Sequence, residues 1–478
     1  MDSPTCGTSR GSSLPWHARA ITDLDSTPFW LDNPEAPAPE GPLTGFDECD
    51  LAVVGGGFTG LWAALQAKER DLGRDVALFE AGRVGWQASG RNGGFCMSTL
   101  THGTSNGEAK FPGEIERLEA LGMENLAGME ETCKRYEIDC AWERTGELAL
   151  ATETWQADDL REAIDALERT GRSYEFFDRQ AIQAEVTTAT AIAGLWLVDG
   201  CVMVDPARLA WGLAGACRRL GVRIYEGTPV TALARAGAGV RLTTPAGSMR
   251  AARAVLGTNA FKPLLKRLNL LVVPVYDYAL VTEPLAPEQR AAIGWRRRQG
   301  LCDIGNHFHY FRLTADDRIL WGGYDAVYHY GSAVRPEFNR RQETFATLSR
   351  HFFALFPQLE GVRFTHGWGG AIDTSTRFCP FFGRALGGRV AYALGYTGMG
   401  VGASRFAAQV TLDLLSGERT PLTELQLVRS TPVPWPPEPL RWGVVDLTQR
   451  AMTHADGHDG VRNAWLRTLD RLGVGFDS

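Results

Sequence analysis

Three glycines near the start of the chain, Gly55, Gly57 and Gly60, have the spacing Gly-x-Gly-x-x-Gly. A short apolar run, residues 50–54, precedes them, and a helical stripe of leucine and alanine, residues 61–72, follows. This order of strand, loop and helix suits a dinucleotide, because the loop lets backbone approach a pyrophosphate and the helix N-terminus offers free N–H groups. The alternative is a purely structural glycine turn, and the pattern favours the dinucleotide.

The residues around the next apolar run, 76–79, indicate which dinucleotide this is. Glu80 lies 20 residues beyond Gly60, where a carboxylate accepts hydrogen bonds from ribose hydroxyls and disfavours a 2′-phosphate. Residues 82–95, GRVGWQASGRNGGF, then show neither helical nor strand periodicity. A glycine-rich loop lets backbone amides line an extended ligand beyond the adenosine, as FAD requires, whereas the alternative is a flexible surface loop.

A second strand, turn and helix lies late in the chain. Residues 390–394 are apolar, residues 395–400 are rich in glycine, and residues 404–415 have a helical pattern. A helix N-terminus there could stabilise negative charge that develops on a reduced flavin, and the same helix would pack on the sheet. Because no second complete Gly-x-Gly-x-x-Gly is present, we expect no separate nicotinamide domain.

These motifs need an α/β scaffold to position them. Asp205 followed by Pro206 predicts the start of a helix that ends near residue 220. Further strands are expected at 222–225, 230–233, 240–244 and 254–258. The alternation indicates an α/β domain interleaved with a mainly antiparallel region.

Composition and charge narrow the classes of partner. With 49 basic and 56 acidic residues the net charge is −7, and there is no basic run, so nucleic acid is not an expected partner. The nine cysteines form no Cys-x-x-Cys pair and follow no secretory signal. No apolar run reaches the ~18 residues of a membrane span. We therefore expect a cytoplasmic protein without a membrane span.

Five motifs, in order, resemble the FAD-dependent glycine/D-amino acid oxidase (DAO) superfamily, and within it the γ-glutamylputrescine oxidase-like amine oxidoreductases. The motifs are DLAVVGGGFTG, FEAGRVGWQASGRNGGF, ARAVLGTNAF, GWGGAIDTSTRFCPFFGR and ALGYTGMGVGAS. They lie within residues 47–416. The resemblance implies an α/β (α+β) fold, in which a Rossmann-like FAD-binding domain of the glutathione-reductase type is interleaved with an antiparallel-sheet substrate domain.

The resemblance also implies a division of the chain. The FAD-binding domain would comprise residues 47–110, 195–262 and 362–416, and the substrate domain residues 111–194 and 263–361. Residues 1–46, rich in proline, would drape over the body. Residues 417–478 would form a C-terminal helical extension, in which a proline-rich stretch leads into two short amphipathic helices.

The resemblance implies FAD contacts at a set of residues that follow the motifs. The fingerprint would face the pyrophosphate, Glu80 the ribose, the loop after it the flavin, and Val230 the adenine by its backbone. The full set is Gly55, Gly57, Phe58, Thr59, Gly60, Glu80, Ala81, Arg83, Ala88, Ser89, Arg91, Asn92, Gly93, Gly94, Val230, Thr258, Asn259, Gly398, Met399 and Gly400.

The substrate pocket has candidates but no assigned catalytic residue. The candidates are Tyr278, His309, Tyr324, Trp368 and Asp373, and each aromatic residue among them is also an ordinary core residue. An anionic substrate would need a cation such as Arg91 or Arg312, whereas Asp373 would suit a cationic amine, and the sequence leaves this choice open. His307 and His309 are expected to pack rather than bind metal, so no metal site is predicted.

For a flavoenzyme of this superfamily we expect oxidation of the C–N bond of a small-molecule amine or amino acid to an imine. Hydride would pass to flavin N5, and O2 would give hydrogen peroxide. A dehydrogenase that passes electrons to a quinone or carrier protein is the alternative, and a flavin-binding assembly subunit without turnover is an alternative of another class. Some members of the superfamily attach the flavin covalently through a cysteine in the segment that matches residues 368–381, or through a histidine in the segment that matches residues 89–94. In this chain Cys379 falls late in the first segment and the second contains no histidine, so non-covalent FAD is expected.

Overall fold

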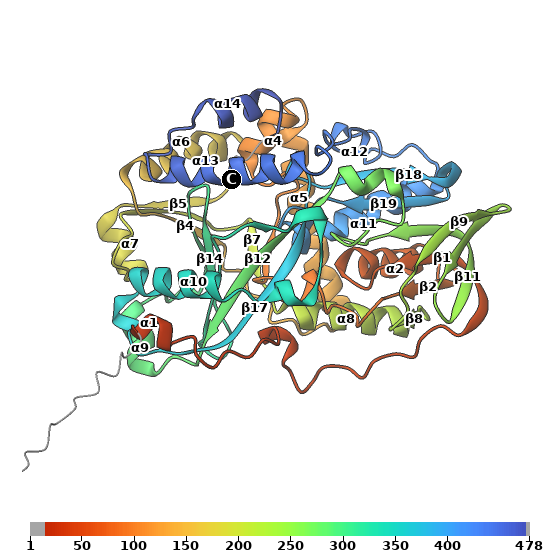
Figure 1. The fold of residues 1–478 in the computed structure, drawn as a ribbon, viewed down its shortest axis with the longest axis horizontal. Helices are drawn as coiled ribbons and strands as arrows, with labels where there is room; N and C mark the ends of the chain where they lie inside the picture. The colour runs from red at the N-terminus through yellow and green to blue at the C-terminus, as the bar shows by residue number, and fades with distance from the viewer. Residues whose placement is uncertain (1–14, 475–478) are drawn as a thin grey trace, which may run out of the picture.

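The computed structural model describes residues 15–474 and contains two large sheets (Figure 1). The first sheet has the strand order β18-β19-β11-β1-β2-β8, and β10 and β9 extend it from β11. Its strands are β1 (Gly45–Val54), β2 (Val76–Phe79), β8 (Arg223–Tyr225), β9 (Ala232–Ala236), β10 (Gly239–Thr243), β11 (Gly247–Leu256), β18 (Phe381–Ala385) and β19 (Val390–Leu394).

The centre of this sheet is parallel. β1 pairs in parallel with β11 and with β2, and β11 pairs in parallel with β19. All of β2 and the last four residues of β1 are buried, as expected for strands covered on both faces. Strands are present near all the predicted positions, but β1 and β11 begin earlier, at residues 45 and 247, and β9 spans 232–236 where 230–233 was predicted.

Three helices pack at this sheet: α2 (Phe58–Arg70), α8 (Pro206–Arg219) and α11 (Gly400–Ser416). The alanine-rich α2 is buried along most of its length because it contacts both α8 and α11. Asp205 caps α8, since its carboxylate accepts a hydrogen bond from the backbone N–H of Arg208 at 2.9 Å. The helix predicted from Asp205-Pro206 is confirmed.

The second sheet is mainly antiparallel and has the order β16-β12-β15-β14-β13-β4-β6-β5, with β17 paired to β12. Only the β13–β4 pair within it is parallel. Its strands are β4 (Glu147–Ala151), β5 (Tyr174–Phe177), β6 (Ala193–Leu197), β12 (Val273–Thr282), β13 (Gly300–Asp303), β14 (His309–Leu313), β15 (Ile319–Gly323), β16 (Val327–Tyr328) and β17 (Phe364–Thr374). β6 thus spans the domain boundary expected at 195, and β17, which lies within the residues 362–416 expected in the FAD-binding domain, pairs instead with β12 of the second sheet.

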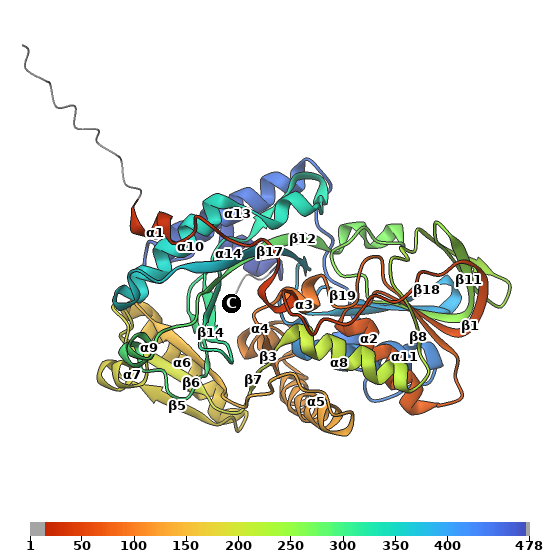
Figure 2. The same cartoon turned by 90° about the horizontal axis from the view of Figure 1, so that it is seen from below.

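Shorter elements connect the two sheets and flank them. A small ribbon, β3 (Phe95–Met97) with β7 (Cys201–Met203), lies between the two sheets, where β3 contacts α11 and β7 contacts β13 (Figure 2). The remaining α-helices are α1 (Trp16–Arg19), α3 (Ala88–Arg91), α4 (Thr104–Lys110), α5 (Ile115–Arg135), α6 (Thr154–Arg169), α7 (Arg179–Glu185), α9 (Pro287–Ile293), α10 (Gln342–Leu355), α12 (Gln426–Arg429), α13 (Leu440–Asp456) and α14 (Ala464–Arg471). Figure 2 shows the two sheets side by side along the long axis.

Both ends of the described chain lie against the body. Trp30 is buried and donates a hydrogen bond to the carbonyl of Asn92 at 2.9 Å, while residues 1–14 of the expected N-terminal segment lie outside the described residues. In the C-terminal extension α13 is 17 residues long, so the expectation of two short helices is wrong for α13. Within residues 15–474, no helix is both long enough and apolar enough for a membrane crossing.

Candidate active site

The fingerprint turn brings backbone unusually close to backbone. Gly55 has a φ of +109°, a conformation that L side chains rarely adopt. A Cβ at Gly60 would lie 1.9 Å from the carbonyl oxygen of Gly55, so any side chain there would separate α2 from β1. The turn thereby directs the N-terminus of α2 into the main cavity described below, where N–H groups and the helix dipole favour phosphate.

Glu80, which follows the last residue of β2, holds the backbone of the same turn through its carboxylate. Its carboxylate accepts hydrogen bonds from the backbone N–H groups of Gly56 and Gly82, both at 2.8 Å. Burial raises the pKa of Glu80 above its usual value. The side chain lines the cavity, so a ribose hydroxyl would find a carboxylate that is already oriented.

The loop after β2 is more regular than its sequence indicates. Residues 88–91 form one short turn of helix, α3, whereas no helix was expected in the glycine-rich segment. Ser89 Oγ accepts a hydrogen bond from Phe58 N–H at 2.9 Å, and Asn92 Nδ2 donates to Ala88 and Ser89 carbonyls. These contacts lock the loop onto the first turn of α2.

Two indoles hold the far side of this loop. Trp368 donates to the carbonyl of Arg91 at 2.9 Å, and Trp30 donates to that of Asn92 at the same distance. Trp368 is almost fully buried although it contributes to the cavity wall. Its indole N–H is therefore engaged with the protein backbone.

A cavity of about 820 Å³ joins these elements to the second sheet. This volume lies within the ~300–1,000 Å³ common for small-molecule sites. The wall includes most of the residues expected to contact FAD: Gly55, Gly57, Phe58, Thr59, Glu80, Ala81, Ala88, Ser89, Arg91, Asn92, Gly93, Val230, Thr258, Asn259, Gly398, Met399 and Gly400. A glycine cradle, a helix N-terminus and an oriented carboxylate in one elongated cavity fit FAD.

Three expected FAD residues are not in the cavity wall. Gly60 packs against the carbonyl of Gly55, and the Arg83 guanidinium donates to the carbonyl of Pro37. Gly94 donates its N–H to Asn92 Oδ1 at 2.8 Å. Gly60 and Gly94 therefore support the backbone of the cradle, whereas Arg83 holds the N-terminal segment at Pro37.

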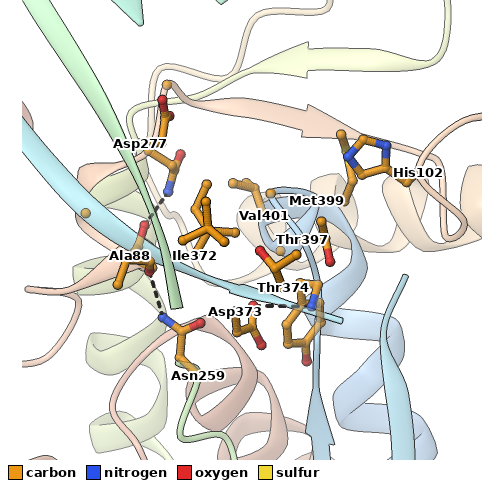
Figure 3. A pocket seen from close by; sticks show the side chains of 18 of the residues that line it. Ala88, His102, Asn259, Asp277, Ile372, Asp373, Thr374, Thr397, Met399 and Val401 are labelled. Carbon is orange, nitrogen blue, oxygen red and sulfur yellow. Dashed lines mark hydrogen bonds between the residues drawn. The ribbon is translucent and has the colours of Figure 1, made fainter. Parts of the chain in front are cut away.

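Asp373 holds the glycine-rich turn before α11. Its carboxylate accepts hydrogen bonds from the N–H groups of Gly395 at 2.6 Å and Tyr396 at 3.2 Å. Tyr396 Oη in turn lies 2.7 Å from Thr59 Oγ1, which links the late turn to the fingerprint. Burial raises the pKa of Asp373 to about 7. Figure 3 shows Asp373, Thr374 and Thr397 grouped at the cavity.

On the substrate side, Tyr276 and Tyr278 flank an acid that sequence reasoning missed. Asp277 lies between them on β12 and lines the cavity, and Tyr310 donates a hydrogen bond to its carboxylate at 2.6 Å. Burial raises the pKa of Asp277 to about 6. The Tyr310 ring packs against the α3 loop so closely that a Cβ at Gly93 would lie 2.7 Å from it.

The Asp277 and Tyr310 pair therefore lies beside the loop expected to pass under the flavin. The signal available in the sequence was the alternation Tyr-Asp-Tyr on a strand, with the aspartate on the opposite face from the two core tyrosines. Tyr278 directs its hydroxyl to the carbonyl of Phe338 at 2.8 Å, although it too contributes to the wall. Figure 3 places Asp277 across the cavity from His102.

The histidine pair has acidic partners that the sequence did not reveal. His309 Nδ1 lies 2.6 Å from Asp303 Oδ2, and His307 Nδ1 lies 3.1 Å from Asp456 Oδ2. His309 stacks between Trp321 and Tyr324 outside the cavity wall, whereas Tyr324 is part of the wall. Within residues 15–474, no group of three or more ligating side chains could hold a metal ion.

The two arginines considered for an anionic substrate are engaged with carbonyls. Arg91 donates to the carbonyls of Trp86 at 2.8 Å and Gly369 at 3.2 Å. Arg312 is almost fully buried, lies outside the cavity wall, and donates to the carbonyl of Val204 at 2.7 Å. Arg312 is therefore withheld from the cavity, whereas Arg91 lines it with part of its guanidinium engaged by the two carbonyls.

The C-terminal extension contributes to the wall, which the sequence did not indicate. Four residues of α13 line the cavity together with Trp435 of the proline-rich stretch: Val445, Thr448, Gln449 and Met452. No local motif marks these residues as functional, because their position depends on where α13 docks.

Comparison with known proteins gives one consistent family. Residues 50–414 match the family described as DAO, FAD dependent oxidoreductase. Gamma-glutamylputrescine oxidoreductase of Escherichia coli (strain K12) is 32% identical over 77% of this chain and 84% of its own length. "Probable oxidoreductase OrdL" of Haemophilus influenzae is 28% identical over 79% of this chain and 85% of its own.

The fold has close counterparts among solved structures. Glycine oxidase from Geobacillus kaustophilus superposes with a TM-score of 0.67 at 22% identity, covering 80% of this chain and 99% of that one. The fold expected from the sequence is therefore confirmed. The family match over residues 50–414 includes strands of both sheets. It ends before α13 and α14, which therefore lie outside the part of the chain that the family describes.

Proposed function

The chain belongs to the DAO family of FAD-dependent oxidoreductases, and on this premise we propose that it oxidises the C–N bond of an amine to an imine, with FAD accepting hydride at N5 and dioxygen taking up the electrons as hydrogen peroxide. Enzymes of this family act on amines or amino acids, and the chain is an FAD-dependent oxidoreductase of that kind. The observation that carries the proposal is the single cavity shared by the fingerprint and the Asp277–Tyr310 pair.

The residues of the first sheet hold the cofactor in this proposal. The N-terminus of α2 receives the pyrophosphate, Glu80 the ribose, and the α3 loop supports the flavin ring. The turn held by Asp373 presents the N-terminus of α11, where its N–H groups stabilise negative charge. We propose that FAD is bound without a covalent link, since Cys379 is buried outside the cavity wall.

The residues of the second sheet receive the substrate. Asp277 attracts a protonated amine toward the α3 loop and, when ionised, is able to take the proton that the amine loses before oxidation. Tyr310 orients that carboxylate through the 2.6 Å hydrogen bond. Arg312 lies outside the cavity wall, and Arg91, which lines it, already donates to two backbone carbonyls; we therefore propose an amine as the substrate in preference to an amino acid with its α-carboxylate.

Oxygen consumption tests the proposed reaction and its acceptor. Purified holoenzyme is supplied with aliphatic amines, amino acids and γ-glutamyl amines, and oxygen and peroxide are followed. We expect peroxide in proportion to an amine consumed. If the flavin is reduced by amines while no oxygen is used, the acceptor is a quinone or carrier protein; if no compound reduces it, a cofactor-holding subunit is the better description.

We propose that the protein is located in the cytoplasm. The eight cysteines among residues 15–474 are free thiols, which suits a reducing compartment. Cys6 lies outside the described residues.

A further inference from the structure

Helix α13 covers the part of the cavity formed by the second sheet. It lies beyond residues 50–414 and runs over the strands of that sheet (Figure 1). Val445, Thr448, Gln449 and Met452 line the cavity at spacings that place them on one helical face. Residues 302–308 and 323–326, at the β13–β14 and β15–β16 connections, line the same part of the cavity.

Hydrogen bonds hold α13 firmly at this position. The Asp456 carboxylate accepts from the backbone N–H groups of Asn306 at 2.8 Å and His307 at 3.1 Å, and from Asn306 Nδ2 at 2.7 Å. Gln449 Nε2 donates to the carbonyl of Ala326, and Trp465 of α14 donates to Thr448 Oγ1 at 3.0 Å. The helix is thus a fixed wall, and its side chains set the space available.

The chamber between α13 and these loops is lined by apolar side chains and by acidic side chains. Val445, Met452 and Trp435 give an apolar surface, whereas Asp303 and Asp325 contribute carboxylates. The basic side chains here are already paired, because His307 contacts Asp456 and Arg341 contacts Asp325 at 2.9 Å. The carboxylates are paired as well, Asp303 with His309 Nδ1 at 2.6 Å and Asp325 with Arg341, so these charges are balanced within the protein and a hydrocarbon chain would meet an apolar face.

A smaller cavity of about 260 Å³ adjoins the chamber beneath α13. The two cavities share wall residues from α13 and from the loops beside it. These residues are Val445 and Gln449 of α13, and His307, Asp325 and Ala326 of the loops. The contact from Gln449 to Ala326 lies where they meet. The space beyond the reacting end therefore continues under α13.

We propose that the part of the substrate remote from its reacting C–N bond lies against α13, and that this helix selects an extended aliphatic amine without negative charge at its far end. The inference rests on the proposed function, since it assumes that the reacting nitrogen lies at Asp277. Met452 and Val445 are the specificity-determining side chains, and because His307 and Arg341 are already paired with Asp456 and Asp325, they offer no free partner to a distal carboxylate.

Four probes of matched chemistry test this selection: propylamine, hexylamine, 1,6-diaminohexane and 6-aminohexanoate. Half-saturating concentrations are measured with the holoenzyme in the absence of air, by calorimetry for a probe that leaves the flavin oxidised and from the concentration dependence of flavin reduction for a probe that reduces it. We expect tighter binding for hexylamine than for propylamine, by roughly threefold to fourfold for each added methylene that is buried. The compound 6-aminohexanoate is expected to bind most weakly among the three long probes.

Two substitutions at Met452 locate the effect. Met452→Trp is expected to weaken hexylamine at least about tenfold while leaving propylamine unchanged, and Met452→Ala, which only removes volume, is expected to reduce the advantage of hexylamine over propylamine. Leu447→Trp is the matched control, because Leu447 is on the exposed side of α13. The ratio of flavin to protein reports whether each variant folds.

The outcomes separate this inference from the proposed function. Binding that depends on length and on Met452, without flavin bleaching by any probe, would keep the inference and overturn the reaction. Two results would overturn the role of α13 alone. The first is flavin bleaching by amines with the same dependence on chain length in Met452→Trp as in the natural protein. The second is binding of 6-aminohexanoate as tight as that of hexylamine. Absence of binding by all four probes would overturn both.

Discussion

Asp277 and Tyr310 connect the second sheet to the α3 loop through one buried hydrogen bond. Burial raises the pKa of Asp277 to about 6, so this carboxylate is ionised above that pH and neutral below it. Its attraction for an ammonium group is therefore present at neutral pH and is lost as the pH falls. We expect amine affinity to fall by up to roughly tenfold for each pH unit below 6.

Half-saturating amine concentrations measured between pH 5 and pH 8 check this dependence. In Asp277→Asn the fall should disappear, and affinity at pH 8 should be lower than in the natural protein. Tyr310→Phe removes a hydrogen bond that favours the ionised form, so the transition should move to higher pH. An unchanged pH profile in Asp277→Asn would show that another group titrates.

Gly60 gives a prediction about the cofactor cradle. A Cβ there would lie 1.9 Å from the carbonyl oxygen of Gly55, so Gly60→Ala must displace α2 from β1. We expect a loss of about 1–3 kcal/mol in the free energy of unfolding, together with a lower FAD content. Gly41→Ala is the control, since a Cβ at Gly41 meets nothing within 4 Å. Full FAD content in Gly60→Ala would contradict the close approach.

Single residues differ in how well the sequence predicts them. The fingerprint and Glu80 could be placed because strand, glycine spacing and helix are contiguous in the chain. Asp277 was missed because one aspartate between two tyrosines carries no local motif, and its role depends on a loop almost 200 residues earlier. The acidic partner of His307, Asp456, was missed for the same reason, whereas Asp303, only six residues before His309, was missed because the turn between β13 and β14 brings the two side chains together.

At the scale of elements, the turn before α11 depends on a carboxylate from β17. Burial raises the pKa of Asp373 to about 7, above its usual value near 3.8. A raised pKa means that the folded state binds the proton more tightly than the unfolded chain does. The resulting stabilisation is full below pH 3.8 and is lost as the pH rises through 7.

Asp373→Asn should therefore change the pH dependence of folding. Between pH 5 and pH 7 the natural apoprotein should lose stability relative to the variant, by roughly 1.4 kcal/mol per pH unit at most. Urea unfolding of both apoproteins at several pH values measures this difference. A difference that does not change with pH would mean that Asp373 keeps one protonation state throughout.

The elements of the first sheet were easier to predict than those of the C-terminal extension. Buried parallel strands have apolar runs and helices have caps, as Asp205 shows, so local patterns suffice there. The length of α13 was underestimated, because exposed Leu440, Trp442 and Leu447 blur its amphipathic pattern. Its docking over the second sheet depends on Asp456 and Gln449, whose partners lie more than 100 residues away.

At the scale of the whole molecule, FAD would occupy the cavity that the two sheets share. Cys379 lies outside the cavity wall and the α3 loop contains no histidine, so these two segments offer no covalent attachment. Acid precipitation of the yellow protein should therefore leave the flavin in the supernatant. Flavin that stays with the pellet after washing would show a covalent bond.

Reduction of the bound flavin in the absence of air tests the proposed activity most directly. Holoenzyme is mixed anaerobically with an excess of hexylamine, and the visible flavin absorption is followed. Oxidation of the C–N bond predicts that the absorption falls as the cofactor is reduced and that the corresponding aldehyde forms on hydrolysis of the imine. Unchanged absorption with hexylamine and with every other amine and amino acid tried would contradict an amine-oxidising function.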